Sequence, residues 1–279
     1  METIKAYSDI VVKYILGREE TKDILLAFIN SVLIDAEFDE ITEIEINNPF
    51  NIKEFEDDKN SILDIKATDI NGRMYNVEIQ SLGDYTYINR TLYYWARLYS
   101  SQVQDADRYT KIKPVICINL LNFKLIDATE RFHTSYIIQE KYDPSLILTD
   151  HLVLHFLELP KINEIIKGTY LEKWLMYFKN EGSGEETMQT IIKDDPILQR
   201  VHHEYNKFTM DDKLREAYEN RIKRERDYNT LLYNAEQRGI EKGRDEGMLI
   251  TAINMKKNGA NMEFISKVTG LTVEEIEKL

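Results

Sequence analysis

The sequence predicts an α/β fold in which a mixed sheet is built first and a mainly helical C-terminal region follows it. Three observations predict this. An apolar pattern of helical spacing opens the chain, strand-like segments then follow around one aromatic-rich helix, and the stretch from Lys161 onward is mainly helical in pattern. The order expected for the first part is α-β-β-β-α-β, which is typical of a sheet covered by helices.

The first helix is expected over residues 8–34, where apolar side chains recur at helical spacing. Gly17 lies inside this stretch and is expected to split it into two pieces. Ser8 or Asp9 is the expected N-cap, because short polar side chains accept hydrogen bonds from the first free N–H groups of a helix. The first strand is expected at 41–48, directly before a proline.

A β-hairpin is the strongest local signal. Residues 61–69 and 73–80 both alternate apolar and polar side chains, and the segment Ile70-Asn71-Gly72 separates them. Glycine after asparagine between two alternating runs is typical of a hairpin turn.

The alternation also predicts the register of the hairpin. A two-residue Asn71-Gly72 turn would pair Ile65 with Glu78 and put the apolar faces on opposite sides of the sheet. A three-residue loop places Gly72 at the left-handed position that such loops favour. Because a slip of one residue turns a whole strand over, we predict the three-residue loop, which pairs Leu63 with Ile79, Ile65 with Val77, and Ala67 with Tyr75.

The rest of the first part completes the sheet. The aromatic-rich segment 87–104 is expected to be a helix, and the continuous apolar run 113–123 is suited to a central strand. Residues 135–140 and 151–159 are expected to be further strands at the edge of the same sheet. This gives a first domain over residues 1–160.

The C-terminal part is expected to form a helical region over 161–247 and a small helix-turn-helix-like tail over 248–279. In the tail, Gly270 separates two short helices, and Thr272 with Glu275 has the pattern of a capping box. The second tail helix carries three glutamates and one lysine, which favours packing or oligomerisation over DNA reading. Glycines at 239, 243 and 247 favour an exposed or self-associating helix, so a homo-oligomer formed through the C-terminal helices is one expected partner arrangement.

Composition limits the function classes. The 279 residues are 43% hydrophobic and 30% charged, as in ordinary globular proteins, and the single cysteine allows no disulfide within one chain. Cys117 lies in an apolar run, so a buried structural thiol is expected. No stretch approaches the ~20 apolar residues that span a bilayer, and the N-terminus lacks a secretion signal, so no membrane partner and a cytoplasmic location are expected.

The net charge of −13 argues against tight non-specific DNA binding, because Lys and Arg side chains drive that binding by releasing counterions from the phosphates. Residues 1–60 alone hold fifteen Asp and Glu against six Lys and Arg. An acidic surface does not exclude a small metal-dependent site in a cleft.

The predicted register has a chemical consequence. It places Asp64 opposite Glu78, with Lys66, Asn76 and Gln80 on the same face. Two facing carboxylates repel each other unless a cation lies between them or one is protonated. Hard oxygen ligands on a rigid scaffold suit Mg²⁺, which can activate water beside a phosphate. The alternative is a solvent-exposed polar face on an edge hairpin.

The segment ILDIKATDINGRMYNVEIQ resembles the D-x(n)-(D/E)-x-(K/Q) core of the PD-(D/E)XK nuclease superfamily. More narrowly, it is similar to the Rpn family of recombination-promoting nucleases and transposases. The segments SDIVVKYILGREETKDIL, RTLYYWARLYSSQ and VTGLTVEEIEKL share this resemblance, which therefore spans most of the chain. It implies a restriction-endonuclease-like fold and a Mg²⁺- or Mn²⁺-dependent endonuclease that hydrolyses DNA, with a role in recombination or transposition.

The resemblance also implies roles for individual residues. Asp64 and Glu78 would be metal ligands, with the backbone carbonyl of Ile79 as a third. Gln80 stands where the superfamily core usually has a catalytic lysine, and the narrower family often has this glutamine, which carries no charge. Lys66, on the same face, is a candidate source of the missing positive charge; otherwise it is a surface lysine or a partner of Glu78.

Two further sets of residues are candidates. Asp9 matches the acidic residue that the first helix often contributes to such sites, and a plain N-cap is the alternative. In the helix after the hairpin, Arg90, Tyr94, Arg97 and Ser101 share one face and would contact a nucleic-acid backbone there. The alternative places Tyr94 in the core and lets the arginines balance nearby acidic groups.

The histidines do not indicate a zinc site. His151 and His155 are four residues apart in an expected strand, which separates them by ~13 Å. Two other functions stay open beside the nuclease. One is a catalytically inactive relative that binds nucleic acid or a protein partner, and the other is an oligomeric scaffold that works through the helical tail.

Overall fold

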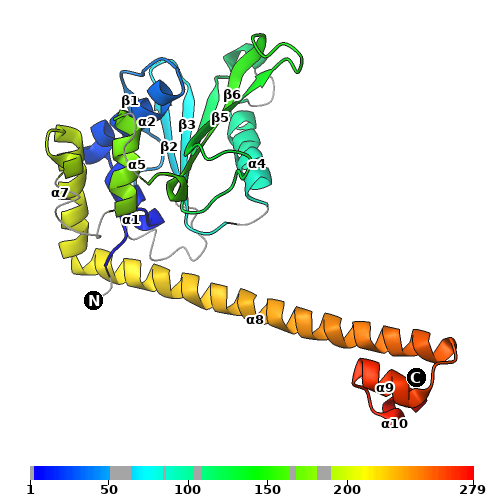
Figure 1. The fold of residues 1–279 in the computed structure, drawn as a ribbon. Helices are drawn as coiled ribbons and strands as arrows, with labels where there is room; N and C mark the ends of the chain where they lie inside the picture. The colour runs from blue at the N-terminus through cyan, green and yellow to red at the C-terminus, as the bar shows by residue number, and fades with distance from the viewer. Residues whose placement is uncertain (1–2, 51–63, 84–85, 104–107, 164–167, 181–189) are drawn as a thin grey trace. The chain divides into compact units, whose positions relative to one another are not determined.

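The computed structural model of the chain describes residues 3–50, 64–83, 86–103, 108–163, 168–180 and 190–279 (Figure 1). The chain forms two compact units, Met1–Tyr218 and Glu219–Leu279. Within the described residues, no helix is long and apolar enough to cross a membrane.

The first unit holds all of the strands that the described residues form. Its elements are, in chain order, α1 (Asp9–Leu16), η1 (Glu19–Thr21), α2 (Lys22–Asp35), β1 (Ile44–Ile46), β2 (Ile65–Asp69), β3 (Met74–Gln80), α4 (Tyr87–Ser100), η2 (Tyr109–Lys111), β4 (Val115–Leu121), β5 (His133–Gln139), β6 (Ile147–Glu158), η3 (Leu159–Lys161), α5 (Tyr170–Asn180) and α7 (Pro196–Met210). Helix α8 (Asp212–Lys257) begins in the first unit and continues into the second, where α9 (Met262–Thr269) and α10 (Val273–Glu277) follow.

The six strands form one mixed sheet in the order β1-β2-β3-β4-β6-β5. Strands β1, β2 and β3 are antiparallel neighbours, β3, β4 and β6 run parallel, and β5 returns antiparallel along β6. The predicted α/β class, the α-β-β-β-α-β order and the mixed sheet are therefore confirmed.

Helices cover both faces of the sheet (Figure 1). Helix α4 packs on one face, where Trp95 and Leu98 lie against buried Val115, Cys117 and other apolar side chains. Helices α1 and α2 cover the opposite face. Cys117 is 1% exposed, which confirms that it is a buried thiol, and this burial raises its pKa to about 12.

The predicted hairpin register is confirmed. Ile65 pairs with Val77 and Ala67 with Tyr75, and a three-residue loop joins the strands. Gly72 has a φ of 80°, the left-handed conformation expected there. The pair Leu63–Ile79 lies outside the described residues, because Leu63 is not among them.

Asp69 holds this loop closed. Its backbone N–H donates to the carbonyl of Arg73 at 3.0 Å. Its carboxylate oxygen Oδ1 accepts hydrogen bonds from the backbone N–H groups of Asn71 (2.8 Å) and Arg73 (2.9 Å). These bonds satisfy donors of the three-residue loop and so stabilise the observed register.

Several boundaries differ from the prediction. The opening helix divides at Gly17, as expected, but β6 begins at Ile147 instead of residue 151. The pairing of β5 with β6 continues beyond an irregularity at Ile138, because a bulge lets the two strands stay hydrogen-bonded toward their turn.

The compact units also differ from the expected division at residue 160. Helices α5 and α7 pack on α1 and α2, so they belong to the same unit as the sheet. The Trp174 ring lies 5.4 Å from the Phe28 ring, and the Phe208 ring lies 5.3 Å from the Tyr14 ring, measured between centroids.

The second unit has a small core of its own, formed by Ala252, Ile265 and Ile276. Gly270 ends α9 with a φ of 76°, and Thr272 with Glu275 forms the predicted capping box of α10. Gly239, Gly243 and Gly247 all lie on helix α8. Self-association of this helix stays a prediction.

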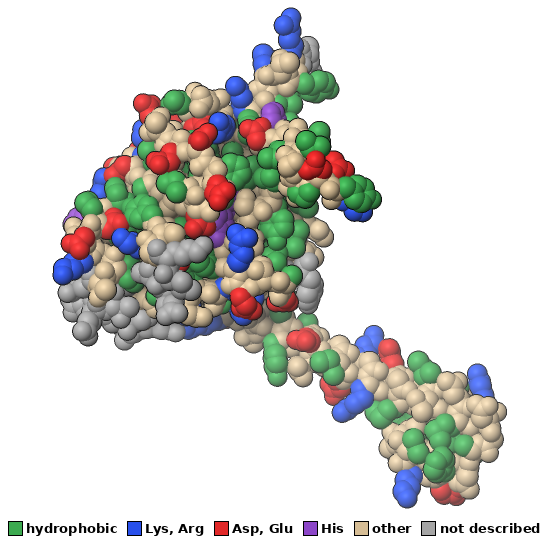
Figure 2. Space-filling view, turned by 45° about the horizontal axis from the view of Figure 1, so that its top comes forward, with side chains coloured by type: hydrophobic (Ala, Val, Ile, Leu, Met, Phe, Trp, Pro, Cys, Tyr) green, Lys and Arg blue, Asp and Glu red, His purple; other side chains and the backbone are tan. Residues whose placement is uncertain are grey.

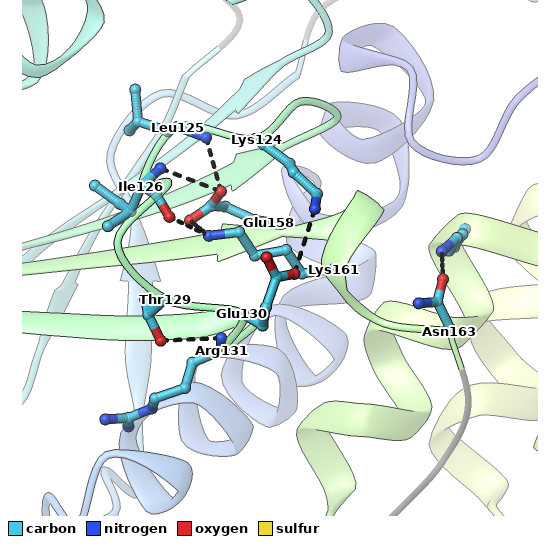
Figure 3. A network of polar contacts seen from close by, with 10 residues as sticks. Lys124, Leu125, Ile126, Thr129, Glu130, Arg131, Glu158, Lys161 and Asn163 are labelled. Atoms are coloured by element: carbon cyan, nitrogen blue, oxygen red, sulfur yellow. Dashed lines mark hydrogen bonds and ion pairs between the residues drawn. The ribbon is translucent and has the colours of Figure 1, made fainter.

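A buried ion pair ties the segment after β4 to the end of β6 (Figure 3). The Lys161 ammonium donates to Glu158 Oε1 at 2.9 Å and to the carbonyl of Ile126 at 2.6 Å. Glu158 Oε2 accepts from the backbone N–H of Leu125 at 2.7 Å. Because both charged side chains are almost fully buried, these contacts offset the cost of removing them from water.

A second buried chain of polar groups lies on the sheet face that α2 covers. Asp35 Oδ2 contacts His133 Nδ1 at 2.6 Å, and His133 Nε2 contacts His155 Nδ1 at 3.0 Å. Burial lowers the pKa of His155 to about 3, and the neighbouring His133 adds to this shift. His155 is therefore neutral in the folded protein near neutral pH.

We predict that replacing Gly72 with alanine lowers the free energy of unfolding by about 1–2 kcal/mol, because a Cβ atom is disfavoured at this positive φ. The new Cβ would also lie 3.2 Å from the Lys113 side chain, which must move. Gly72→Asn should cost less, since asparagine adopts the left-handed region more readily. Urea unfolding of the three proteins tests this, and equal stability of wild type and Gly72→Ala would contradict it.

We predict a stability loss in mild acid that depends on His155. The unfolded chain takes up a proton at His155 below a pKa of 6.5, whereas the folded chain does not until about pH 3. Stability is therefore lost as the pH falls through this window, by about 2 kcal/mol between pH 7 and pH 5. Denaturant unfolding at both pH values should show a smaller pH dependence for His155→Leu. The same dependence in that variant would refute the assignment.

Candidate active site

Asp64 and Glu78 meet at one pocket. Continued by one residue beyond β2, the observed register places Asp64 opposite Glu78. The pocket, of about 270 Å³, lies between this part of the sheet and helix α4. It is lined by Asp64, Lys66, Asn76, Glu78, Tyr94, Arg97, Leu98 and Ser101.

Each of the two carboxylates has a cation of its own. Lys66 Nζ lies 3.1 Å from Asp64 Oδ2, and Arg90 Nη2 lies 3.3 Å from Glu78 Oε1. Burial raises the pKa of the Glu78 carboxyl, the positive charge of Arg90 opposes this shift, and the negative charge of Asp64 adds to it. The positive charges of Lys66 on β2 and Arg90 on α4 thus offset the repulsion between the two carboxylates.

Asn76 is a site residue to which the sequence assigned no role. Its side chain lines the pocket, yet the residue is only 6% exposed. Within the described residues, its oxygen Oδ1 has no hydrogen-bond partner. A buried amide oxygen normally has one, so this atom is available to a ligand in the pocket. The signal in the sequence was its position two residues before Glu78 on the same face.

Gln80 lies beside the pocket and is not part of its lining. Its oxygen Oε1 accepts a hydrogen bond from Arg90 Nη2 at 2.9 Å, and its Nε2 donates to the carbonyl of Leu82 at 3.0 Å. Ile79 lies between Glu78 and Gln80 in β3 and is buried. The role expected for its carbonyl stays a prediction.

Asp9 is not among the residues that line the pocket. It lies in the first turn of α1, and its Oδ1 accepts a hydrogen bond from the backbone N–H of Ile10 at 2.8 Å. Ser8 occupies the N-cap position, although its side chain makes no capping hydrogen bond. The catalytic role implied for Asp9 stays a prediction without support from the pocket.

One face of α4 is directed at the site, with the spacing expected from the sequence. Tyr94, Arg97 and Ser101 line the pocket, and Arg90 reaches Glu78. Tyr94 is half-exposed and so is not a core residue of the helix, whose buried residues are Tyr87 and Thr91.

The donor set fits a small, hard divalent cation. Two carboxylates and one amide oxygen surround the pocket, and Mg²⁺ takes such oxygen ligands together with water. Within the described residues, no group of three or more His, Cys, Asp and Glu side chains could hold a metal ion. Among the described residues that line the pocket there is no histidine or cysteine, the nitrogen and sulfur ligands that zinc favours.

Comparison with known proteins agrees with this geometry. A family model described as PD-(D/E)XK nuclease family transposase matches residues 6–235. The match includes the whole sheet, the hairpin and helix α4. A search of curated proteins and a search of solved structures found no match. The resemblance seen in the sequence is confirmed, and the chain belongs to the PD-(D/E)XK nuclease family of transposases.

Proposed function

We propose that this chain is a Mg²⁺- or Mn²⁺-dependent endonuclease that hydrolyses phosphodiester bonds of DNA, with a role in recombination or transposition. Its family is one of nuclease-like proteins. The observation that carries the proposal is the pocket in which Asp64 and Glu78 lie opposite each other beside the unpartnered oxygen of Asn76.

Asp64, Glu78 and Asn76 would hold the metal ion, with the carbonyl of Ile79 as a further ligand. Bound there, the ion would lower the pKa of a water and stabilise negative charge on the phosphate. In the hydrolysis, a water oxygen forms a bond to phosphorus and one P–O ester bond breaks. The protons of the water pass to the leaving oxygen and to solvent.

The side chains around the carboxylates would place the substrate. Arg97 and Tyr94 extend from α4 into the pocket lining, where a guanidinium can pair with a phosphate oxygen and a phenol can donate a hydrogen bond to one. Lys66, whose side chain is 42% exposed, can leave its ion pair with Asp64 and pair with a phosphate oxygen instead. These contacts would orient the phosphodiester above the two carboxylates.

The rest of the surface gives little help to DNA binding. The net charge is −13, and on the face that Figure 2 shows, acidic and basic side chains are interspersed without a continuous basic band. Long-range attraction of the DNA backbone is therefore weak. The divalent ion would supply much of the local attraction for phosphate.

Replacing either carboxylate should abolish cleavage. We expect Asp64→Asn and Glu78→Gln to lower the cleavage rate by about 100-fold or more, because loss of even an outer partner of a metal ligand commonly costs 10–100-fold. The assay is cleavage of supercoiled plasmid with Mg²⁺ or Mn²⁺, and EDTA should stop it. Glu45→Gln is the matched control, since Glu45 is an exposed carboxylate on β1 of the same sheet.

Two outcomes would reject the proposal. If both variants cleave as fast as wild type, the site lies elsewhere. If wild type fails to cleave with either metal, yet binds labelled DNA, the chain is a nuclease-fold binding protein without catalysis.

A further inference from the structure

The Arg90 guanidinium is held between two side chains of strand β3. Its Nη2 contacts Glu78 Oε1 at 3.3 Å and donates to Gln80 Oε1 at 2.9 Å. The orientation of the Gln80 amide follows from its other contact. The carbonyl of Leu82 only accepts hydrogen bonds, so the Gln80 NH₂ group must face it and Oε1 must face Arg90.

The ring of Tyr87 also fixes the position of Arg90. Arg90 lies one turn into α4, and its guanidinium lies over the ring of Tyr87, 4.8 Å from the centroid. Tyr87 is fully buried, and its hydroxyl donates to Asn119 Oδ1 on β4 at 3.0 Å. The ring is therefore a fixed support for the cation.

A glutamine at position 80 has a physical purpose in this arrangement. Lysine has three donors and no acceptor, so a lysine at 80 could not hold Arg90 and its positive charge would repel the guanidinium. Glutamine supplies the acceptor. Arg90 then brings a positive charge from α4 to the Glu78 carboxylate. A lysine at position 80, two residues further along β3, could otherwise have supplied that charge.

Lys66 does not fill this place. It pairs with the other carboxylate, that of Asp64, and its side chain is 42% exposed against 29% for Arg90. An exposed, flexible ammonium holds its partner less firmly than a supported guanidinium with two acceptors.

We propose that Arg90 and Gln80 act as one unit that replaces the lysine usual in the superfamily core, with Arg90 as the positioning residue that fixes the Glu78 carboxylate for the metal ion. This rests on the proposed function. Arg90 does not line the pocket itself. It acts through Glu78, as outer partners of metal ligands commonly do.

The first test uses Arg90→Met and Arg90→Met/Gln80→Lys. We expect Arg90→Met to weaken Mn²⁺ binding, titrated without DNA, by about 10–100-fold and to lower kcat for plasmid cleavage by a similar factor. KM for DNA should change by less than about threefold, because Arg90 touches no phosphate in this scheme. A lysine at 80 should recover at least about tenfold of both losses, since its ammonium can pair with Glu78 in place of Arg90.

The controls separate this role from simple destabilisation. Arg73→Met removes an arginine whose contact, with Asp69 at 4.0 Å, lies at the hairpin loop, and it should leave Mn²⁺ binding and kcat near wild type. Thermal unfolding of every variant shows whether it folds. The rescue by lysine at a different position identifies the charge as the active element, because a purely structural loss would not be restored there.

A second test asks whether Gln80 and Arg90 form one unit. Gln80→Met removes the acceptor and should weaken Mn²⁺ binding less than Arg90→Met does. The double variant Arg90→Met/Gln80→Met should bind Mn²⁺ no more weakly than Arg90→Met alone, since the effects of coupled residues do not add. If the losses of Mn²⁺ affinity in the two single variants add up in the double variant, Gln80 and Arg90 act independently and do not form one unit.

Three results would overturn the proposal. Arg90→Met could bind Mn²⁺ more tightly than wild type, which would make Arg90 a competitor of the metal. It could raise only KM, which would make it a DNA contact. It could match wild type in Mn²⁺ binding. If wild type cleaves no DNA but the Mn²⁺ titrations follow the expected order, the positioning role stands and the nuclease function fails.

Discussion

The register of β2 against β3 is the constraint on which the candidate site depends. Ile65 and Val77 enter the core as a pair, and that alone directs Asp64 and Glu78 to the opposite face. A slip by one residue would turn one of the two carboxylates to the other face of the sheet, away from the pocket. The local device that selects the register is small: a glycine with a positive φ and the carboxylate of Asp69 accepting from loop N–H groups.

This explains why so much of the site could be predicted from the sequence. The periodicities of strands and helices depend only on neighbouring residues. The alternation in the hairpin therefore predicted that Lys66 and Asn76 lie on one face of the sheet, and the 3.6-residue repeat predicted which face of α4 is directed at the site. What the sequence could not show was how closely α4 crosses the sheet. That crossing decides whether Arg90 reaches DNA or Glu78, and how deeply Asn76 is buried. The Asp35–His133–His155 chain was hidden for the same reason, because it joins three distant elements.

The charges at the site show how two facing carboxylates can be accommodated in one folded pocket. Glu78 is 5% exposed, so an unpaired carboxylate there would carry a large desolvation cost. Arg90 offsets that cost for Glu78, and Lys66 does the same for the less buried Asp64. A divalent ion entering the pocket must therefore share these carboxylates with cations already present. Arg90, supported by the Tyr87 ring, would then stay beside Glu78. Lys66, which is more exposed, could leave Asp64 and turn toward a phosphate of the proposed substrate.

The same balance reconciles an acidic protein with the anionic substrate proposed for it. A charge of −13 spread over the surface acts at long range and is screened by salt within about 10 Å. The pocket lining holds two carboxylates and two cations, Lys66 and Arg97, and Arg90 adds a third positive charge beside Glu78. Phosphate is then attracted at one place and repelled elsewhere. If DNA is the substrate, as proposed, this distribution of charge would favour a single phosphodiester in the pocket over extended contact with the DNA backbone.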